Sequence, residues 1–347
     1  MSDGNKFDKY YDFRIATVND IDMIMQFIDM HWKKDHIMAK DRRLFEYQHL
    51  YGEKVTFILA FSKETSELEA ILGYIPTSSN IQKNDVWTAI WKVRDDHNNV
   101  PMLGLELVKR LEKLEGCRNI IIVGANPKTA VPVMKVMMKY HTDRMKHYYR
   151  LGDWEEFKIA SNVDNKNNTN KKYPEILWKQ LDESNFIELF SELEKSGRTQ
   201  EVPYKDKEYY INRYYKHPYY LYKVYKIETE NDICIVILKE VEIQGRIISR
   251  IIDYIGNQSC FSKIGMFFSE LLKNHKYEYI DFYCLNFDDK SICEAGFVER
   301  TEDDSAIIPN YMEPFLQENI EIYTCYKNGK CVIFKGDADQ DRPNIIK

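Results

Sequence analysis

The stretch Val86-Trp-Thr-Ala-Ile-Trp-Lys-Val-Arg-Asp-Asp-His-Asn-Asn-Val-Pro-Met-Leu-Gly-Leu105 decides the fold that the sequence predicts. Its first eight residues are rich in β-branched and aromatic side chains, as half-buried strands are, and the polar residues 94–99 end that strand. From Met102 onward apolar residues recur with helical spacing as far as Leu114, and residues 119–123 form a continuous apolar run suited to a central strand. The stretch therefore predicts a strand, a tight turn, a helix that starts directly from the turn, and a second strand.

The turn before this helix is a candidate anion site. A helix that begins there directs free backbone N–H groups and the positive end of its dipole toward the turn. The turn can therefore hold the pyrophosphate of a nucleotide-bearing cofactor. The alternative is an ordinary crossover between two strands, in which Gly104 serves only close packing.

Further elements are predicted on both sides of this unit. They are, in order, a strand at 13–17, helices at 21–30 and 42–50, strands at 55–61 and 68–76, a helix at 126–140 and a strand at 144–151. Up to residue 123 the predicted order is β-α-α-β-β-β-α-β.

This order and the turn resemble the acyl-CoA-binding core of the GNAT superfamily of N-acyltransferases, over residues 13–152. In that family a turn of the type Arg/Gln-x-x-Gly-x-Gly/Ala precedes the helix. Asn99, Met102 and Gly104 stand at the three positions, and only Gly104 matches, so Met102 has to leave its N–H accessible although it carries a side chain. The resemblance implies that acetyl-CoA, or another acyl-CoA, is the co-substrate. It implies these cofactor-binding residues: Trp91, Val93, Asn99, Val100, Met102, Leu103, Gly104, Leu105 and Asn126.

The chain repeats the pattern after a polar linker. Residues 161–172 contain five Asn and almost nothing to bury, and strands and helices resume beyond them. The loop 256–265 lacks the Gly-x-Gly spacing, so no cofactor is assigned to the second half. The predicted fold is α/β (α+β), with two tandem GNAT-like domains that are each a mixed twisted sheet flanked by helices. The predicted boundaries are a tail at 1–12, a cofactor domain at 13–160, the linker, an acceptor domain at 173–335 and a polar tail at 336–347.

The segment from His31 to Glu46 supplies the catalytic candidates. In the GNAT fold the link between the first two helices lies over the acceptor, so His36 is predicted to remove the proton of the amine, because an imidazole titrates near neutral pH. Asp41 and Glu46 are the next candidates, and Trp32 is predicted to contact the acceptor. The alternative is that His36 only packs against Trp32. A Tyr that often acts as the acid in GNAT enzymes is missing, since Val133 and Met134 stand where it is expected.

The second half carries the predicted acceptor residues. Nine Tyr fall between 204 and 225, interleaved with basic residues, and three Asp alternate near the C-terminus. Stacking and charge of this kind suit a nucleobase, a sugar or a phosphate, although the Tyr can equally be core residues. The predicted substrate-binding residues are Tyr204, Arg213, Asp253, Asp339 and Arg342. These segments resemble two-domain GNAT-like proteins of bacterial surface-polysaccharide pathways, which implies a nucleotide-linked amino sugar as acceptor.

Composition limits the alternatives. A net charge of −6 argues against nucleic acid as the main partner. Seven Cys without a Cys-x-x-Cys motif, no export signal and no run of 18 apolar residues predict a cytoplasmic protein without a membrane span, and no metal site is predicted. The sequence thus predicts an acyl-CoA-dependent N-acyltransferase that acts on a small amine or a sugar nucleotide. The alternatives are a Fem-like aminoacyl or peptidyl transferase and a binding protein for acyl-CoA or a sugar nucleotide without turnover.

Overall fold

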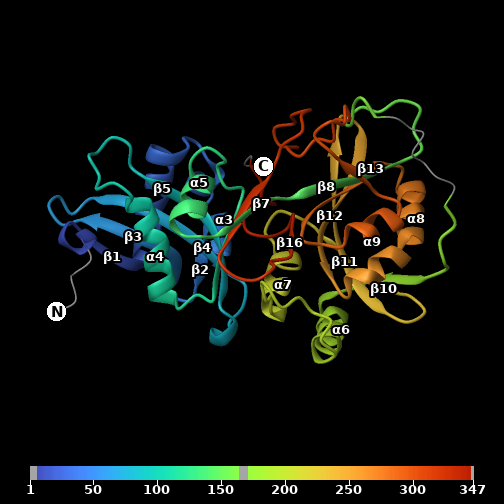
Figure 1. Ribbon diagram of the computed structural model, residues 1–347, viewed down its shortest axis with the longest axis horizontal. Coiled ribbons are helices and arrows are strands. Elements are labelled where there is room, and N and C mark those ends of the chain that lie inside the picture. Colours follow the sequence, from blue (N-terminus) through green and yellow to red (C-terminus); the bar gives the residue numbers. More distant parts are fainter. Residues whose placement is uncertain (1–5, 164–170, 345–347) are drawn as a thin grey trace.

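The structure, a computed structural model of the 347-residue chain, describes residues 6–163 and 171–344. It contains two mixed sheets of eight strands, A and B, which lie side by side (Figure 1). No helix within the two described ranges is long and apolar enough to cross a membrane.

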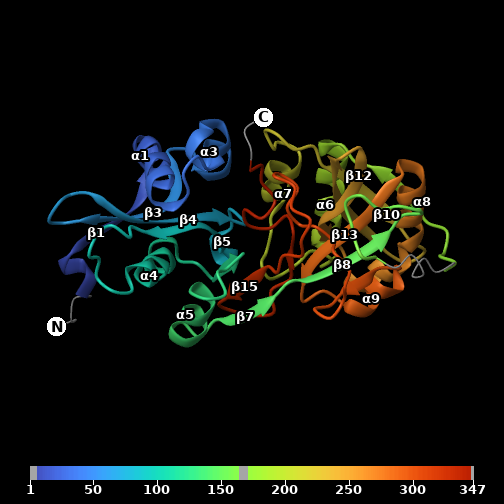
Figure 2. The same cartoon turned by 90° about the horizontal axis from the view of Figure 1, so that it is seen from above.

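Sheet A is built mainly from the first half of the chain, in the order β1-β3-β4-β5-β6-β15-β7, with β2 paired to β3. Its strands are β1 (Tyr11–Thr17), β2 (Leu50–Tyr51), β3 (Lys54–Ser62), β4 (Leu68–Pro76), β5 (Asp85–Val93), β6 (Asn119–Val123), β7 (His141–Arg144) and β15 (Tyr323–Tyr326). Helices α1 (Ile21–Phe27), α2 (Ile37–Lys40) and α3 (Arg42–His49) cover one face, and α4 (Leu103–Glu115) and α5 (Ala130–Met137) cover the other (Figure 2).

The alternation of apolar side chains along β3 explains this sandwich. Val55, Phe57 and Leu59 pack with α1, α2 and α3, whereas Ile58 and Ala60 pack with α4. Successive side chains of a strand point to opposite faces, so a strand that is apolar throughout needs helices on both sides.

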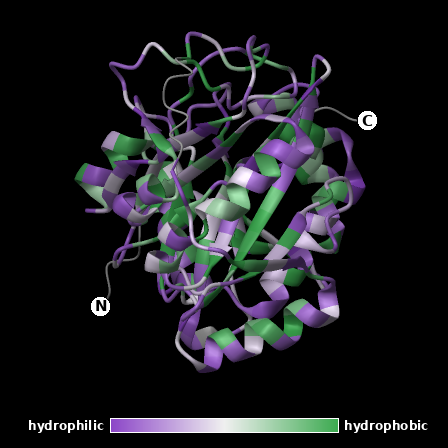
Figure 3. Ribbon diagram, turned by 90° about the vertical axis from the view of Figure 1, so that its right-hand side faces the viewer, coloured by the Kyte–Doolittle hydropathy of each residue, from purple (hydrophilic) through white to green (hydrophobic). Residues whose placement is uncertain are grey.

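Sheet B is built mainly from the second half, in the order β14-β8-β13-β12-β11-β10-β9, with β16 paired to β13. Its strands are β8 (Lys146–Leu151), β9 (Leu177–Gln180), β10 (Lys223–Glu228), β11 (Ile233–Ile243), β12 (Arg246–Ile255), β13 (Tyr277–Leu285), β14 (Val298–Arg300) and β16 (Ile333–Phe334). Helices α8 (Gly265–His275) and α9 (Asp289–Glu294) cover one face. Helices α6 (Glu183–Lys195) and α7 (Lys207–Tyr214) cover the other and share a core with Ile75, Trp87 and Ile121 of sheet A. In Figure 3 the strands at the centre of the view are mostly hydrophobic, whereas the helices also present hydrophilic faces.

The two halves of the chain exchange a strand. β15, from near the C-terminus, lies between β6 and β7 in sheet A, and β8, from the first half, lies between β13 and β14 in sheet B (Figure 2). The prediction that residues 144–151 close the first sheet is therefore wrong for β8, which pairs in sheet B. The predicted domain 13–160 contains β8, which pairs in sheet B, and the predicted domain 173–335 contains β15, which pairs in sheet A. Most of the predicted linker, residues 164–170, lies outside the described residues.

The Tyr-rich segment forms helix α7. Tyr209, Tyr210 and Tyr214 are buried in the core that α6 and α7 share with both sheets. These three side chains therefore follow the alternative prediction of core residues.

Candidate active site

The two parallel strands at the centre of sheet A diverge at their carboxyl ends. Residues 85–88 of β5 pair with residues 119–122 of β6, and β6 ends one residue later, whereas β5 continues to Val93. Beyond Thr88, β5 pairs with β4 on one side and with no described strand on the other. Because backbone N–H and C=O groups need partners, an extended ligand can pair with this open edge of β5.

The turn that follows β5 leads into the N-terminus of α4, which can bind an anion. Met102 precedes α4 with a φ of 73°, in the left-handed region that favours glycine, and its side chain is exposed. Within the described residues, no group accepts a hydrogen bond from the backbone N–H of Met102, Gly104 or Leu105. These N–H groups and the helix dipole favour a phosphate at this place.

Several residues predicted to touch the cofactor make hydrogen bonds that hold the turn in place. Asn99 donates from Nδ2 to the carbonyl of Arg94 at 3.1 Å and accepts the Tyr11 hydroxyl at 3.1 Å, and the Val100 N–H donates to the same hydroxyl at 3.0 Å. Trp91 Nε1 donates to the carbonyl of Gly104 at 3.1 Å. Their side chains thus hold the turn against β5 and β1.

The other predicted cofactor residues have packing or capping contacts. A Cβ on Gly104 would lie 3.1 Å from Trp91 Nε1 and 3.4 Å from Val93 Cγ2, so this glycine permits close packing on β5. Leu103 and Leu105 are buried in the core of sheet A. Asn126 Oδ1 accepts the N–H groups of residues 128 and 129 ahead of α5.

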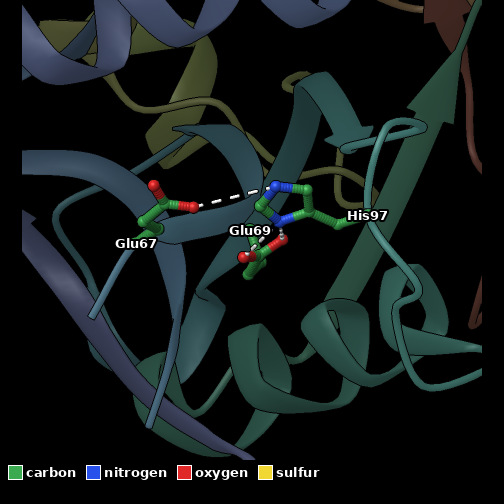
Figure 4. Close-up of side chains that lie close together, drawn as sticks. All are labelled: Glu67, Glu69 and His97. Atoms are coloured by element: carbon green, nitrogen blue, oxygen red, sulfur yellow. Dashed lines mark hydrogen bonds and ion pairs between the residues drawn. The ribbon is translucent and has the colours of Figure 1, made fainter. Parts of the chain in front are cut away.

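Glu67, Glu69 and His97 lie close together beside the turn (Figure 4), with one possible ligand atom of each within 4.8 Å of the others. His97 Nδ1 lies 2.8 Å from Glu69 Oε1, and its Nε2 lies 2.8 Å from Nη2 of Arg94, whose Nη1 also donates to Glu67 at 3.2 Å. Arg94 can only donate, so His97 carries its proton on Nδ1 and both ring nitrogens have partners. Hydrogen bonds and ion pairs with Arg94 and His97 already engage both carboxylates, and we assign no metal to this cluster.

The contacts of His36 argue against its predicted role as the base. Its Nδ1 accepts the N–H of Met38 at 3.2 Å and caps α2, so the ring proton is on Nε2 and no free lone pair remains. Burial, and then the positive charge of Arg342, lower the pKa of His36 to about 3. The ring lies edge-on to Trp32 at 4.6 Å, which agrees with the alternative prediction of a packed histidine.

Asp41 and Glu46 are also engaged. Asp41 Oδ1 accepts the N–H of Leu44 at 2.9 Å as the cap of α3, and its Oδ2 accepts the hydroxyl of Tyr219 from the second half. Glu46 pairs with Arg42 at 2.6 Å on the surface of α3. Trp32 is half exposed on the link after α1, as the acceptor prediction requires, but no contact in the structure assigns it a ligand.

A cavity of about 470 Å³ lies between sheet B and the segment after β16. Gln340 lines it and donates from Nε2 to the carbonyl of Val123, the last residue of β6, at 3.1 Å. Arg342 lines it as well and lies near enough to His36 to lower its pKa. Gln340 therefore links this cavity, which we call the acceptor cavity after the ligand proposed for it below, to the end of β6.

The chain closes the corresponding divergence in sheet B with its own backbone. β12 and β13 pair in parallel only as far as Ile251↔Phe282, and β16 then pairs with the end of β13. The Gly336 N–H donates to the carbonyl of Ile252 in β12 at 2.8 Å, so the segment is bonded on both sides. Strand β16 thus occupies in sheet B the place that stays open in sheet A.

A buried ion cluster fixes this closing segment. Lys205 Nζ lies 2.8 Å from Asp253 Oδ2 and 2.7 Å from Asp337 Oδ1, and all three side chains are fully buried. The Tyr214 hydroxyl donates to Asp253 at 2.7 Å. Burial lowers the pKa of Lys205, but the two carboxylates more than offset this effect and raise it.

The five substrate residues predicted in the second half separate into four places. Arg342 lines the acceptor cavity, and Asp339 accepts from its Nε at 3.4 Å. Asp253 belongs to the buried ion cluster, and Tyr204 binds Glu194 through its hydroxyl and Asp85 through its N–H. Arg213 lines a different cavity, described below. The structure does not bring these five residues together.

Lys335 is a buried cation in the acceptor cavity that sequence reasoning missed. It is 4% exposed, and no described residue accepts a hydrogen bond from its Nζ. Burial, and then the charges of Arg250 and Lys239, lower its pKa to about 7, although Asp341 and Asp281 oppose the shift. Arg250 is bound to Asp281, and Lys239 to Asp341, so both neighbouring cations already have carboxylate partners.

We expect Lys335→Met to raise the free energy of unfolding by about 1–3 kcal/mol at pH 7, because it removes a buried charge without a partner. A lysine titrates near pH 10.4 in an unfolded chain. Between pH 7 and 10 the unfolded protein therefore binds the proton that folded Lys335 has lost, and wild-type stability rises with pH. Urea unfolding at several pH values should show this rise in the wild type and in Lys330→Met, an exposed control, and a smaller rise in Lys335→Met. Equal pH dependence in all three proteins would contradict the buried charge.

Known structures can be compared with this geometry. A GCN5-related N-acetyltransferase from Anabaena variabilis matches with a TM-score of 0.53 at 10% sequence identity, over 91% of this chain and 72% of that protein. The chain adopts the GNAT fold. N-myristoyltransferase from Saccharomyces cerevisiae with bound myristoyl-CoA gives a TM-score of 0.48 at 10% identity, with 91% and 78% of the two chains covered. A putative acetyltransferase from Pyrococcus horikoshii gives 0.46 at 12% identity, with 95% and 93% covered. The sequence matches no family model and no curated protein.

The GNAT fold confirms the predicted α/β class with two tandem domains, each a mixed sheet flanked by helices. The link to surface-polysaccharide pathways and the individual site residues stay predictions.

Proposed function

We propose that the protein is an acyl-CoA-dependent N-acyltransferase with its cofactor site in sheet A. The observation that carries this proposal is the open edge of β5 beside a helix start with three unpaired N–H groups. The pantetheine arm of CoA pairs with residues 89–93, and its pyrophosphate lies at Met102, Gly104 and Leu105. One CoA binds per chain, because β16 fills the equivalent place in sheet B.

The acceptor cavity supports an amine that also carries an anionic group. Protonated Lys335 supplies a buried cation without a carboxylate partner among the described residues, and Arg342 supplies a planar fork for phosphate or carboxylate oxygens. Gln340 connects this cavity to the end of β6, next to the proposed position of the thioester. A nucleotide-linked amino sugar has both the amine and the phosphates. Catalysis then rests mainly on holding the amine against the thioester.

A thiol-release assay tests the activity. Acetyl-CoA with nucleotide-linked amino sugars should release CoA, and native mass spectrometry should find one CoA per chain. Uridine diphosphate should compete with the acceptor and not with acetyl-CoA. Binding of acetyl-CoA without thiol release from any amine would favour the binding-protein alternative, and acceptance of only polyamines or peptides would exclude the sugar-nucleotide acceptor.

Arg342→Gln tests the acceptor cavity by itself. We expect the acceptor KM to rise about tenfold, the loss typical of one charge-assisted contact, with CoA affinity unchanged. Deletion of residues 336–347 would be a poorer test, because it removes Asp337 from the buried ion cluster and so disturbs the fold. An unchanged acceptor KM in Arg342→Gln would place the acceptor elsewhere.

A further inference from the structure

A second cavity, of about 740 Å³, lies at the other end of sheet A. It is lined by the start of β3, the segment between β4 and β5, and the ends of α3 and α4, and helix α7 from the second half forms its opposite wall. β4 leaves the sheet at Pro76, opposite the start of β5, whereas β5 and β6 diverge at the far end of β5. This interdomain cavity is therefore separate from the proposed acylation site.

Arg213 of α7 reaches this cavity as a cation without a carboxylate partner. Its side chain lines the cavity and is 7% exposed as a residue, and its Nε and Nη2 are buried with no hydrogen-bond partner among the described residues. Burial lowers the pKa of Arg213, and the neighbours that raise it most are tyrosines, Tyr209 and Tyr222 first, with no carboxylic acid among them. Each buried unpaired cation is costly, so its retention calls for a ligand.

Other charged groups near Arg213 have hydrogen-bond or ion-pair partners within the fold. Lys205, two residues before α7 begins, has two carboxylate partners. Lys54 on the opposite wall of the cavity pairs with Glu115 at 2.6 Å, and Asp206 accepts from the N–H of Ser79 at 2.7 Å and caps α7. Among the described residues, none of the acids that line this cavity, Asp206 and Glu208 included, forms a hydrogen bond or ion pair with Arg213.

The rest of the lining is suited to a polar ligand. Gln48, Ser79, Asn80 and Asn84 contribute amide and hydroxyl groups, and the rings of Tyr47, Tyr51 and Tyr209 supply flat apolar surface. A guanidinium binds planar carboxylates and phosphates through two parallel hydrogen bonds. The volume is in the range of ordinary small-molecule sites.

We infer that the interdomain cavity binds a small organic anion, whose carboxylate or phosphate is held by the guanidinium of Arg213. Because its walls come from both halves of the chain, the bound anion bridges α7 to the ends of α3 and β4. This site is independent of the proposed acylation chemistry and stands even if the protein transfers no acyl group.

Arg213→Met removes the charge and keeps the length of the side chain. Without ligand, this variant should melt about 2–5 °C higher than the wild type, since it no longer buries an unpaired cation. A purely structural Arg213 would give the opposite shift, because Met cannot replace its contacts with the tyrosines. If Arg213→Met does not fold, Arg213→Lys provides the second comparison, because it keeps the charge and loses the planar fork.

Ligand binding is tested with two groups of probes at constant ionic strength. Inorganic phosphate and uridine monophosphate represent phosphates, and succinate and citrate represent carboxylates, with chloride as the reference. One group should raise the melting temperature of the wild type and bind about tenfold or more weakly to Arg213→Met or Arg213→Lys. The set of probes that responds shows whether the bound oxyanion is a phosphate or a carboxylate.

Two control variants distinguish this site from the others. Met102→Asp disturbs the helix start in sheet A, and Lys335→Met removes the cation of the acceptor cavity, so neither should change the response that depends on Arg213. A response lost in either control and kept in Arg213→Met would overturn the inference. So would the absence of a response to all four probes, or a lower melting temperature of ligand-free Arg213→Met.

Discussion

Lys205→Met should lower the free energy of unfolding by about 3–5 kcal/mol, because it leaves two buried carboxylates without their cation. Lys205 Nζ lies 2.8 Å from Asp253 and 2.7 Å from Asp337, and none of the three side chains is exposed. Asp337 also accepts the N–H of Phe334 at 2.8 Å, so the cluster holds β16 between β12 and β13. Loss of Lys205 therefore also loosens the segment that lines the acceptor cavity.

Urea unfolding at pH 7 measures this effect. Lys207→Met is the matched control, since Lys207 is two residues away, is partly exposed and pairs only loosely with Glu208, at 3.7 Å. It should change stability by less than about 0.5 kcal/mol. In the Lys205→Met background, Asp253→Asn with Asp337→Asn should recover part of the loss, because the uncompensated charges are then gone. A loss equal to that of the control, or no recovery, would show that the cluster does not hold the fold together.

The local unit at 86–123 could be predicted because its signals lie close together in the sequence. The strand, the turn and the helix start are each encoded within a few residues, and the structure places them at β5, residues 94–102 and α4. Met102 stands where the family motif has a glycine, and its φ of 73° lies in the left-handed region that glycine adopts readily. The apolar runs at 55–61 and 68–76 likewise predicted the strands that the structure has as β3 and β4.

The strand exchange could not be predicted, because no local pattern records which sheet a short strand joins. β15 has four residues and pairs with β6 about 200 positions earlier, and β16 has two residues. Their partners are decided by the tertiary core. The same limit hid Gln340 and Lys335, which became candidates only when the C-terminal segment was placed beside β6 and β12.

The structure argues against the predicted base, His36, for a related reason. Sequence reasoning gave His36 the pKa of a solvated imidazole, but the structure buries the ring and uses Nδ1 as a helix cap. Burial lowers its pKa most, and Arg342, about 300 positions later in the sequence, lowers it further. Residue type therefore suggested chemistry that the environment does not support.

Met102→Asp should weaken acetyl-CoA binding by about 10–100-fold, because it places a negative charge against the proposed position of the pyrophosphate. Met102 is the side chain of choice, since it is exposed at the helix start and carries one of the unpaired N–H groups. Gly104 is less suitable, because any side chain there would press on Trp91. The effect of the lost packing could then not be separated from the effect of the added charge.

Met102→Asn is the matched control for this charge. Asn has nearly the shape of Asp, carries no charge and tolerates the left-handed conformation, so its CoA affinity should stay within about threefold of the wild type. Met102→Gly should in addition raise the free energy of unfolding by about 1 kcal/mol, because it relieves the positive φ. Titration calorimetry with acetyl-CoA compares the three variants. Equal affinities for Met102→Asp and Met102→Asn would mean that no phosphate lies at the start of α4, and the cofactor site proposed for sheet A would then be wrong.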